Sequence, residues 1–412
     1  MAGDGEQVAL ARAPRVLTRV VGGESPLDED EARRWLEPAP EMGSAIAGLC
    51  DRYGGEPGVS LWLRYGRCAL GVALDLCGVG PTDCVALASY QCGAVVKKII
   101  QRTRHTLAYP LDEQLQPLVE EFTEMSRRAH AVITCVYYGS RSGGRRLETL
   151  AAQVLALPNR PWVIEDRVMC APDPDGVRAA ARRCDITVLS FRKHYPVPDG
   201  ALLVAHSARA RRQLRAIEPR VAVRGTVVQD EAIRQKVLAK RGRGIWRSSP
   251  NMVDDPVVNA LAESVASEVL VDQVADSREA DYVSGSAASA AFLERANLDR
   301  DADRVEALSN LLVARLSARG TDVALPLTDC RGLGVPMLVS DPAGVRRRLM
   351  PWGVFLPSHW PAGGLLPACP TARSWHRHEL TMPISSRMSD DDAEYLAKVV
   401  GQNGNEGDRE SH

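Results

Sequence analysis

The sequence predicts an α/β protein in which a large domain with a mainly parallel, mixed sheet is followed by a smaller α+β C-terminal domain. The first observation is a set of short apolar runs that alternate with helical patterns: 84–89, 131–138, 162–164, 186–191 and 201–205. They are too short and too apolar for surface helices, so we interpret them as buried parallel strands. The second observation is a pair of long helical patterns within 255–320. Strand-like runs then follow and predict a small sheet: 323–325, 337–339 and 380–383.

Changes of composition divide the chain of 412 residues further. Residues 1–43 are polar and proline-bearing and predict an N-terminal arm, and 44–254 form the large domain. Within that domain 207–254 is rich in arginine and helical in pattern, which predicts a connector to the small domain at 255–402. Residues 403–412 are polar and glycine-bearing, so we expect a disordered tail.

The bulk composition is that of an ordinary globular protein, and it argues against several functional classes. Apolar residues make up 45% and charged residues 25%, with a formal net charge of -1, so nothing indicates a nucleic-acid or membrane-surface binder. The ten cysteines form no Cys-x-x-Cys pair and no Cys/His cluster at metal-ligand spacing, which argues against a metal site and a disulfide framework. No signal peptide or bilayer-length apolar stretch is recognisable. We therefore expect a cytoplasmic protein with neither nucleic-acid nor membrane partners.

Lysine is scarce in this sequence, and one lysine stands out. The 51 basic residues include only six lysines, and only Lys193 directly follows an apolar, strand-like run. A lysine in this position becomes a nucleophile when burial and neighbouring cations, here Arg192 and His194, lower its pKa enough to supply free amine. The alternative is an ordinary exposed lysine after a strand.

The strand-like run before the lysine segment ends in two acids, of which the second is Asp166. In open α/β sheets ligands bind at the carboxyl ends of strands, so this acid is expected to point into a ligand crevice. The alternative is an acid that caps the next helix or faces solvent. A lysine that forms a Schiff base and a carboxylate that keeps a pyridine nitrogen protonated are the minimum set that makes pyridoxal phosphate (PLP) an electron sink. We therefore predict PLP bound to Lys193, with Asp166 facing the ring nitrogen.

A glycine turn that opens a helical pattern supplies a candidate phosphate site. Gly66, Arg67 and Cys68 would offer backbone N–H groups at the positive end of a helix dipole. Ser190, at the end of the run 186–191, would add a hydroxyl group. Plain helix entry explains the glycine turn equally well.

Further candidates lie at strand ends and in the second domain. Tyr90 and Cys92, which follow the run 84–89, are candidates for contact with a flat cofactor, and a buried core position is the alternative for Tyr90. The substrate is expected to meet polar and aromatic side chains near the lysine or at the entrance: Tyr137, His194, His359 and Trp360.

Taken in order, these segments resemble the DegT/DnrJ/StrS aminotransferases, which are fold type I PLP enzymes that commonly aminate keto-sugars. The likeness covers most of 58–206 and consists of a phosphate turn, a strand with a stacking residue beyond it, the strand of the pyridine-facing Asp, the lysine segment and the strand after it. These are 66–70, 83–90, 163–166, 190–193 and 198–204. Weaker likenesses lie at 382–384 and 389–395. Ser190-Phe-Arg-Lys193 resembles an Arg-Lys variant subgroup of the family.

The resemblance implies an aminotransferase that forms a Schiff base through Lys193 and moves an amino group from an amino acid to a keto acceptor, a sugar or another small molecule. It also implies a homodimer and a role in specialised biosynthesis. Two departures leave other reactions open: Met169 stands where the family usually has a Gln that contacts the cofactor, and the segment that reaches the partner's phosphate is not recognisable, unless 241–247 replaces it. A PLP-dependent lyase, decarboxylase or cyclase is the first alternative. A non-catalytic relative is the second.

Overall fold

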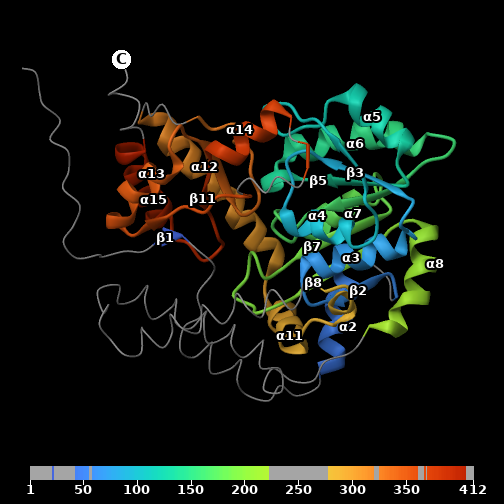
Figure 1. The fold of residues 1–412 in the computed structure, drawn as a ribbon. Helices are drawn as coiled ribbons and strands as arrows, with labels where there is room; N and C mark the ends of the chain where they lie inside the picture. The colour runs from blue at the N-terminus through green and yellow to red at the C-terminus, as the bar shows by residue number, and fades with distance from the viewer. Residues whose placement is uncertain are drawn as a thin grey trace, which may run out of the picture.

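The computed structural model describes residues 21–22, 42–54, 58–221, 277–319, 324–360, 366–367 and 369–404. Its larger part is built on a seven-stranded sheet with helices packed around it, as Figure 1 shows. The strands lie in the order β2-β8-β7-β6-β5-β3-β4, and every neighbouring pair is parallel except β2–β8 and β7–β8. Their bounds are β2 (Ser60–Leu63), β3 (Cys84–Ala88), β4 (His105–Tyr109), β5 (Ala131–Cys135), β6 (Trp162–Asp166), β7 (Ile186–Ser190) and β8 (Ala201–Ala205). The mainly parallel, mixed sheet predicted from the sequence is confirmed.

Five of these strands coincide with the predicted apolar runs, and one of the five differs in direction. The expectation that 201–205 is a parallel strand is wrong, because β8 runs antiparallel to β7, with Ala201 opposite Ser190. The two strands are joined by residues 191–200 alone, whereas a parallel crossover needs about a dozen residues or more. The edge strands β2 and β4 were not predicted.

The central strands are buried on both faces. Every residue of β5, β7 and β8 is buried, and in β6 only Trp162 is partly accessible. Successive side chains of a strand point to opposite faces, so helices must cover both sides of the sheet. The helices of this domain are α2 (Met42–Gly54), α3 (Gly66–Leu76), α4 (Gly93–Ile100), α5 (Val119–Arg128), η1 (Tyr137–Gly139), α6 (Arg141–Leu155), α7 (Pro174–Ala180), α8 (Ala208–Ile217) and η2 (Glu218–Arg220). Across the described ranges, no helix is both long and apolar enough to cross a membrane.

The smaller part is an α+β unit, which apart from one short blue strand is coloured orange to red in Figure 1. Strand β9 (Gly334–Leu338) pairs antiparallel with β11 (Glu379–Pro383), which confirms the small sheet expected from the runs at 337–339 and 380–383. Ala324, from the run at 323–325, makes a single bridge to Leu338. The other elements are β1 (Val21–Gly22), which pairs with β10 (Val354–Phe355), α12 (Leu298–Ala318), α13 (Pro342–Leu349), η5 (Met350–Trp352), α14 (Pro370–His378) and α15 (Asp390–Asn403).

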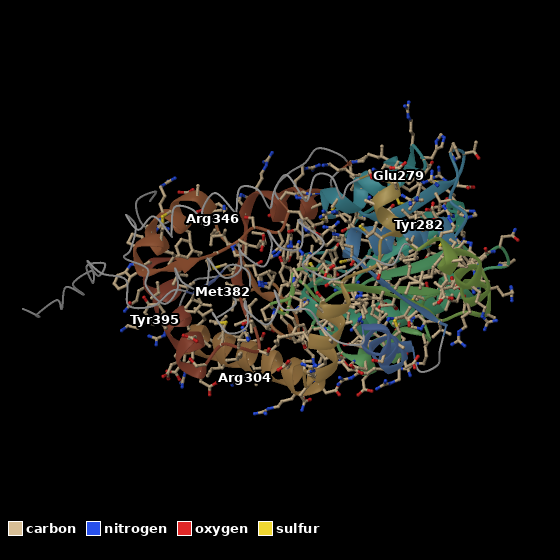
Figure 2. The ribbon with its side chains drawn as sticks, turned by 90° about the horizontal axis from the view of Figure 1, so that it is seen from below. Glu279, Tyr282, Arg304, Arg346, Met382 and Tyr395 are labelled. Carbon is tan, nitrogen blue, oxygen red and sulfur yellow. The ribbon has the colours of Figure 1, made fainter. Side chains whose placement is uncertain are left out.

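Helix α12 reaches from the large domain into the small one, where it packs against α15. Near the large domain, Glu306 of α12 accepts from Arg141 Nη2 at 2.6 Å, and Asp303 accepts from Arg331 Nη2 at 2.7 Å. At its small-domain side, Arg304 pairs with Asp390 at 2.6 Å. In Figure 2 Arg304 lies on the lower side of the molecule, and Glu279 and Tyr282 lie at the upper right, on the large domain.

Residues 277–295 pack on the large domain although they follow the predicted connector. The 3-10 helix η4 (Glu279–Tyr282) lies against α3, and α11 (Ala287–Arg295) lies against α2. Ser286, just before α11, accepts a hydrogen bond from Trp62 Nε1 at 3.1 Å. The predicted boundary at 254 falls within residues 222–276, which lie outside the described residues, as do 405–412 of the predicted tail. Those assignments, and that of the arm, stay predictions.

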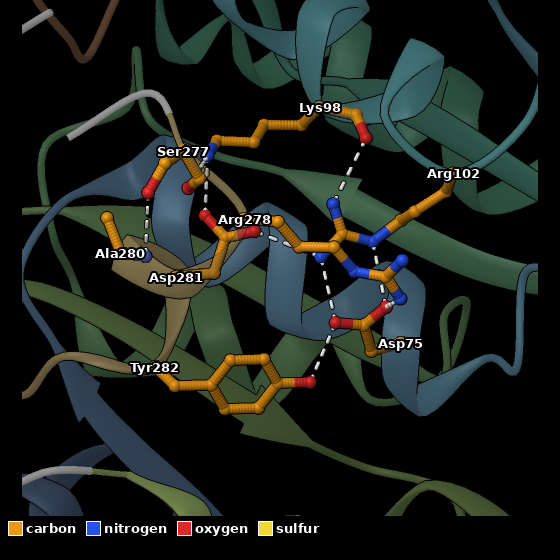
Figure 3. A network of polar contacts seen from close by, with 8 residues as sticks. All are labelled: Asp75, Lys98, Arg102, Ser277, Arg278, Ala280, Asp281 and Tyr282. Atoms are coloured by element: carbon orange, nitrogen blue, oxygen red, sulfur yellow. Dashed lines mark hydrogen bonds and ion pairs between the residues drawn. The ribbon is translucent and has the colours of Figure 1, made fainter. Parts of the chain in front are cut away.

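A buried network of charges holds η4 against α3 and α4 (Figure 3). Asp281 is fully buried and contacts Lys98 Nζ at 2.6 Å and Arg102 Nη2 at 2.9 Å. Arg102 also forms two hydrogen bonds with Asp75, at 2.8 and 2.9 Å. The approach of η4 requires a glycine on α3, because a Cβ on Gly71 would lie 2.1 Å from Asp281 Oδ2. The network therefore fixes residues 277–282 on the helix whose first turn is described below.

We expect Asp281→Asn to destabilise the protein by about 3–5 kcal/mol, since removing one member of a buried ion pair leaves its partners charged and uncompensated. The measurement is the free energy of unfolding in guanidinium chloride. Glu394→Gln is the matched control, because it breaks the exposed Arg315–Glu394 pair and should cost no more than about 1 kcal/mol. Equal losses in the two variants would contradict the role assigned to the buried network.

Candidate active site

The candidate residues converge because four neighbouring strands run in the same direction. β3, β5, β6 and β7 are parallel, so their carboxyl ends share one edge of the sheet. Asp166, the last residue of β6, lies opposite Cys135 of β5 and Val188 of β7. The chain also reverses its direction of winding at this edge, since β4 and β5 lie on opposite sides of β3. Crevices outside such a switch point are where α/β sheets bind ligands.

Asp166 is a buried carboxylate that the protein supports with one backbone donor. The residue is 2% exposed, and Oδ1 accepts a hydrogen bond from Val168 N at 2.9 Å. Burial raises the pKa of Asp166, while the Val168 amide and the charge of Lys193 act in the opposite direction. Lys193 therefore lies within electrostatic reach of this carboxylate. A cationic group placed against Asp166 would favour its ionised form.

Lys193 lies in a turn that is anchored by Phe191, two residues before it. The amides of His194 and Tyr195 both donate to the Phe191 carbonyl, each at 2.9 Å. The Phe191 ring is fully buried, with its centroid 5.6 Å from that of Trp62. The Lys193 side chain is half-buried, and within the described part of the chain its amine forms no hydrogen bond or ion pair. Lys193 and Asp166 thus lie at the same edge of the sheet, the position that the sequence predicts for both.

The first turn of α3 lies against the ends of β6 and β7. The first hydrogen bond within the helix runs from Ala69 N to Tyr65 O at 2.9 Å, and the Tyr65 side chain does not cap the helix. The backbone N–H groups before Ala69 are therefore not used by the hydrogen bonds within the helix. A Cβ on Gly66 would lie 2.9 Å from Val168 Cγ1 and 3.4 Å from Ser190 Cβ, so the turn touches both strand ends. The predicted Gly66, Arg67, Cys68 and Ser190 are brought together here.

Three guanidinium groups lie around the ring that precedes this helix. Arg64, Arg67 and Arg192 place their Cζ atoms 5.1, 4.8 and 5.7 Å from the centroid of Tyr65. Their positive charge adds to that of the helix N-terminus. An anionic group such as a phosphate would be stabilised at this place.

The placement of Tyr90 differs from that expected of a cofactor contact. Its ring is fully buried and lies close to four other rings, those of Tyr137, Trp360, Trp375 and His376, with centroids 5.8, 5.1, 5.6 and 4.8 Å away. Its hydroxyl donates to the His359 carbonyl. Tyr90 therefore packs in the junction between the two domains and does not present a free ring face. The structure supports the alternative of a buried core position.

Cys92 and Met169 stand where the resemblance expects cofactor contacts. Cys92 precedes α4 and lies close enough to Cys135 to influence the pKa of that thiol. It is thus near the strand end that faces Asp166. Met169 is fully buried in the apolar core, and its carbonyl accepts from Leu333 N at 3.1 Å. A thioether side chain offers at most a weak acceptor where an amide would donate.

The predicted substrate contacts fall into two groups. Burial of the imidazole lowers the pKa of His194 to about 3, and Nε2 is buried without a partner among the described residues. Tyr137 is buried, and its hydroxyl donates to the Tyr90 carbonyl. His359 and Trp360 lie on the small-domain side of the junction, with Trp360 packed on Tyr90. His194 therefore lies beside the lysine, whereas the other three form the junction.

Two residues of the site were not predicted from the sequence. Cys135 neighbours Asp166, and the carboxylate of Asp166 and the amine of Lys193 both affect the pKa of its thiol, which burial raises. Cys135 is the last residue of the run 131–138 that pairs with β6, and that position at the strand end would have identified it. Glu379, described below, gave no signal, because a buried acid at a strand start depends on distant partners. Among the described residues, no group of three or more His, Cys, Asp or Glu side chains could hold a metal ion.

Known proteins similar to this chain are found by comparing structures and not by comparing sequences. No protein-family model matches the sequence, and no curated protein matches it. The aminotransferase TlmJ from Streptoalloteichus hindustanus is similar in structure, with a TM-score of 0.62 and 17% identity over 93% of this chain and 98% of that one. A DegT DnrJ EryC1 StrS aminotransferase from Brucella abortus gives a TM-score of 0.56 and 14% identity over 88% and 91% of the two chains.

A third similar structure is a variant of serine palmitoyltransferase from S. paucimobilis with a bound PLP–myriocin aldimine. It gives a TM-score of 0.55 and 13% identity, over 93% of this chain and 80% of that one. At such identities the likeness is one of fold. The chain therefore has the fold type I architecture that its sequence resemblance implies, shared with aminotransferases of the DegT/DnrJ/StrS type.

Proposed function

We propose that the chain is a PLP-dependent aminotransferase that uses Lys193 and Asp166. The observation that supports this most is the shared edge of β6 and β7, where an amine, a buried carboxylate and an uncapped helix N-terminus meet. The first turn of α3 packs closely against these strand ends, since a Cβ on Gly66 would lie 2.9 Å from Val168 Cγ1 and 3.4 Å from Ser190 Cβ. Its backbone N–H groups would therefore bind a phosphate beside Ser190. The surrounding cations suit a dianion.

Each residue would have a defined task. When bound, PLP supplies an electron sink for bonds at the α-carbon of an amino acid. Lys193 would hold the cofactor covalently and move the α-proton, since its amine has no competing hydrogen bond among the described residues. Asp166 would keep the ring nitrogen protonated, with Val168 N orienting the carboxylate. The amides of Gly66, Arg67 and Cys68 and the hydroxyl of Ser190 would hold the phosphate.

The reaction is tested with purified holoprotein. We expect a yellow protein that loses its cofactor absorbance when it is mixed with the correct amino donor, chosen by screening the standard amino acids. The pyridoxamine form of the cofactor should then be recovered by chromatography, and a keto acid should restore the absorbance. An amino acid that is consumed without formation of pyridoxamine phosphate would overturn the assignment of aminotransfer. A protein that binds no PLP would overturn the whole proposal.

The second candidate is another PLP-dependent reaction on an amino acid, namely a lyase, decarboxylase or cyclase. One observation favours it: Met169, fully buried, replaces the amide that the resemblance expects beside the cofactor. The fold is also shared with serine palmitoyltransferase, whose name states a different reaction. The keto acceptor, a sugar or another small molecule, the homodimer and the cytoplasmic location remain part of the proposal. Gel filtration of the holoprotein tests the homodimer.

We expect Gly66→Ala to weaken PLP binding by roughly tenfold, equivalent to about 1.4 kcal/mol. The added methyl group would lie 2.9 Å from Val168 Cγ1, so the first turn of α3 must move away from the strand ends. The dissociation constant is measured by titrating apoprotein with PLP. Gly144→Ala is the control, because a Cβ at this helical position of α6 has nothing within 4 Å. Unchanged affinity in Gly66→Ala would place the phosphate elsewhere.

A further inference from the structure

A fully buried carboxylate at the domain junction is surrounded by donors. Glu379 begins β11, and its side chain is 0% exposed. Oε1 accepts from the Tyr138 hydroxyl at 3.0 Å and from the Thr381 hydroxyl, while Oε2 accepts from His359 N at 2.6 Å. Every oxygen of this acid is therefore used to hold its neighbours. An acid satisfied in this way fixes the positions of the groups that donate to it.

These contacts determine the tautomer of His359. The Thr381 hydroxyl has a single proton, and its closest acceptor is Glu379; its contact with the Tyr138 hydroxyl is longer, at 3.4 Å. Thr381 Oγ1 can therefore only accept from His359 Nδ1, which lies 2.7 Å away. When the imidazole is neutral, its proton is thus on Nδ1, and Nε2 carries the lone pair and can accept a hydrogen bond.

The acceptor nitrogen has no hydrogen-bond partner among the described residues. The His359 side chain is 17% exposed, and its one side-chain hydrogen bond in the described part of the chain is made by Nδ1. The residue also sits at the junction above the carboxyl edge, since its carbonyl accepts from Tyr90 OH and its ring packs on Tyr138 at 5.9 Å.

We propose that His359 contacts the substrate, with Nε2 accepting a hydrogen bond from a hydroxyl or ammonium group that enters between the two domains. Glu379 and Thr381 are positioning residues, because they act only by fixing the tautomer and the angle of the ring. The inference rests on the proposed function, since it needs a substrate bound at the edge that Asp166 and Lys193 share.

Chemical labelling tests whether Nε2 of His359 is accessible and unprotonated, and it needs no substrate. Diethyl pyrocarbonate acylates accessible, unprotonated imidazole nitrogens, and mass spectrometry of holoprotein digests gives a rate for each histidine. His359 should react at Nε2 at a rate near that of the exposed His105, and at least tenfold faster than His194. Thr381→Val should slow this reaction or move it to Nδ1, whereas Thr381→Ser should leave it unchanged. An acylation rate of His359 as low as that of His194, or one that Thr381→Val does not change, would overturn the assignment of the tautomer.

Substrate contact is tested by titrating holoprotein with each of the standard amino acids and following the cofactor absorbance. His359→Asn keeps a donor near Thr381 and removes the acceptor, so the dissociation constant of the active amino acid should rise at least tenfold at unchanged PLP content. His359→Gln should recover part of this loss, and His105→Asn should have no effect. Equal affinities in wild type and His359→Asn would overturn the inference while the proposed function stands. If no amino acid perturbs the wild type, the proposed function fails, and this inference fails with it.

Discussion

Lys193→Ala is expected to yield a folded protein that cannot retain PLP covalently and whose turnover is lower by about a thousandfold or more. The side chain would supply both the covalent bond to the cofactor and the proton transfer, and acid–base catalysis alone contributes on the order of 10²- to 10⁴-fold. Borohydride reduction followed by peptide mass mapping should find the cofactor on Lys193 in the wild type and on no residue in the variant.

Lys398→Ala is the matched control for this experiment. Lys398 lies exposed on α15 in the small domain, so its removal should change neither absorbance nor turnover. Circular dichroism checks that the Lys193→Ala fold is intact. A variant with wild-type turnover, or with cofactor fixed at another lysine, would refute the assignment.

Asp166→Ala should weaken PLP binding by roughly 10- to 100-fold, because a charge-assisted hydrogen bond contributes about 1.5–3 kcal/mol. Turnover should fall further than affinity, since the ring nitrogen would no longer be held in its protonated form. Apoprotein titration gives the dissociation constant, and turnover is measured at saturating PLP to separate the two effects.

Two comparisons make the Asp166 result specific. Asp166→Glu keeps the charge and should recover part of the cofactor affinity. Asp175→Ala removes a side chain that is 85% exposed and should behave like the wild type. If Asp166→Ala retained full turnover at saturating PLP, the carboxylate would have no role in catalysis.

The sequence predicts the pair Lys193 and Asp166 because each lies at or just beyond the end of an apolar run, and both of these runs are buried parallel strands, as expected. Strand direction then brings them to one edge without knowledge of any side-chain contact. Strand β4 was missed for the opposite reason. His105–Tyr109 is an edge strand with exposed and half-buried positions, so it has no continuous apolar run.

The surroundings of the site could not be predicted in the same way. The Tyr90 hydroxyl donates to the carbonyl of His359, 269 residues further along the chain, and the Tyr90 ring packs on Trp360, so the ring direction depends on how the small domain docks. The fixed tautomer of His359 depends in turn on three side chains from two domains. The direction of β8 depends on the length of the connection from β7, and an apolar pattern carries no information about that length.

The aromatic contacts of Tyr90 have a consequence for how reactants arrive. Pulling the two lobes apart would separate Tyr90 from three rings, those of Trp360, Trp375 and His376, and an aromatic pair contributes about 0.5–1.5 kcal/mol beyond its buried area. It would also break the hydroxyl contact with His359. Opening of a hinge at this seam is therefore costly, so we expect the two lobes to stay packed together while reactants enter and leave.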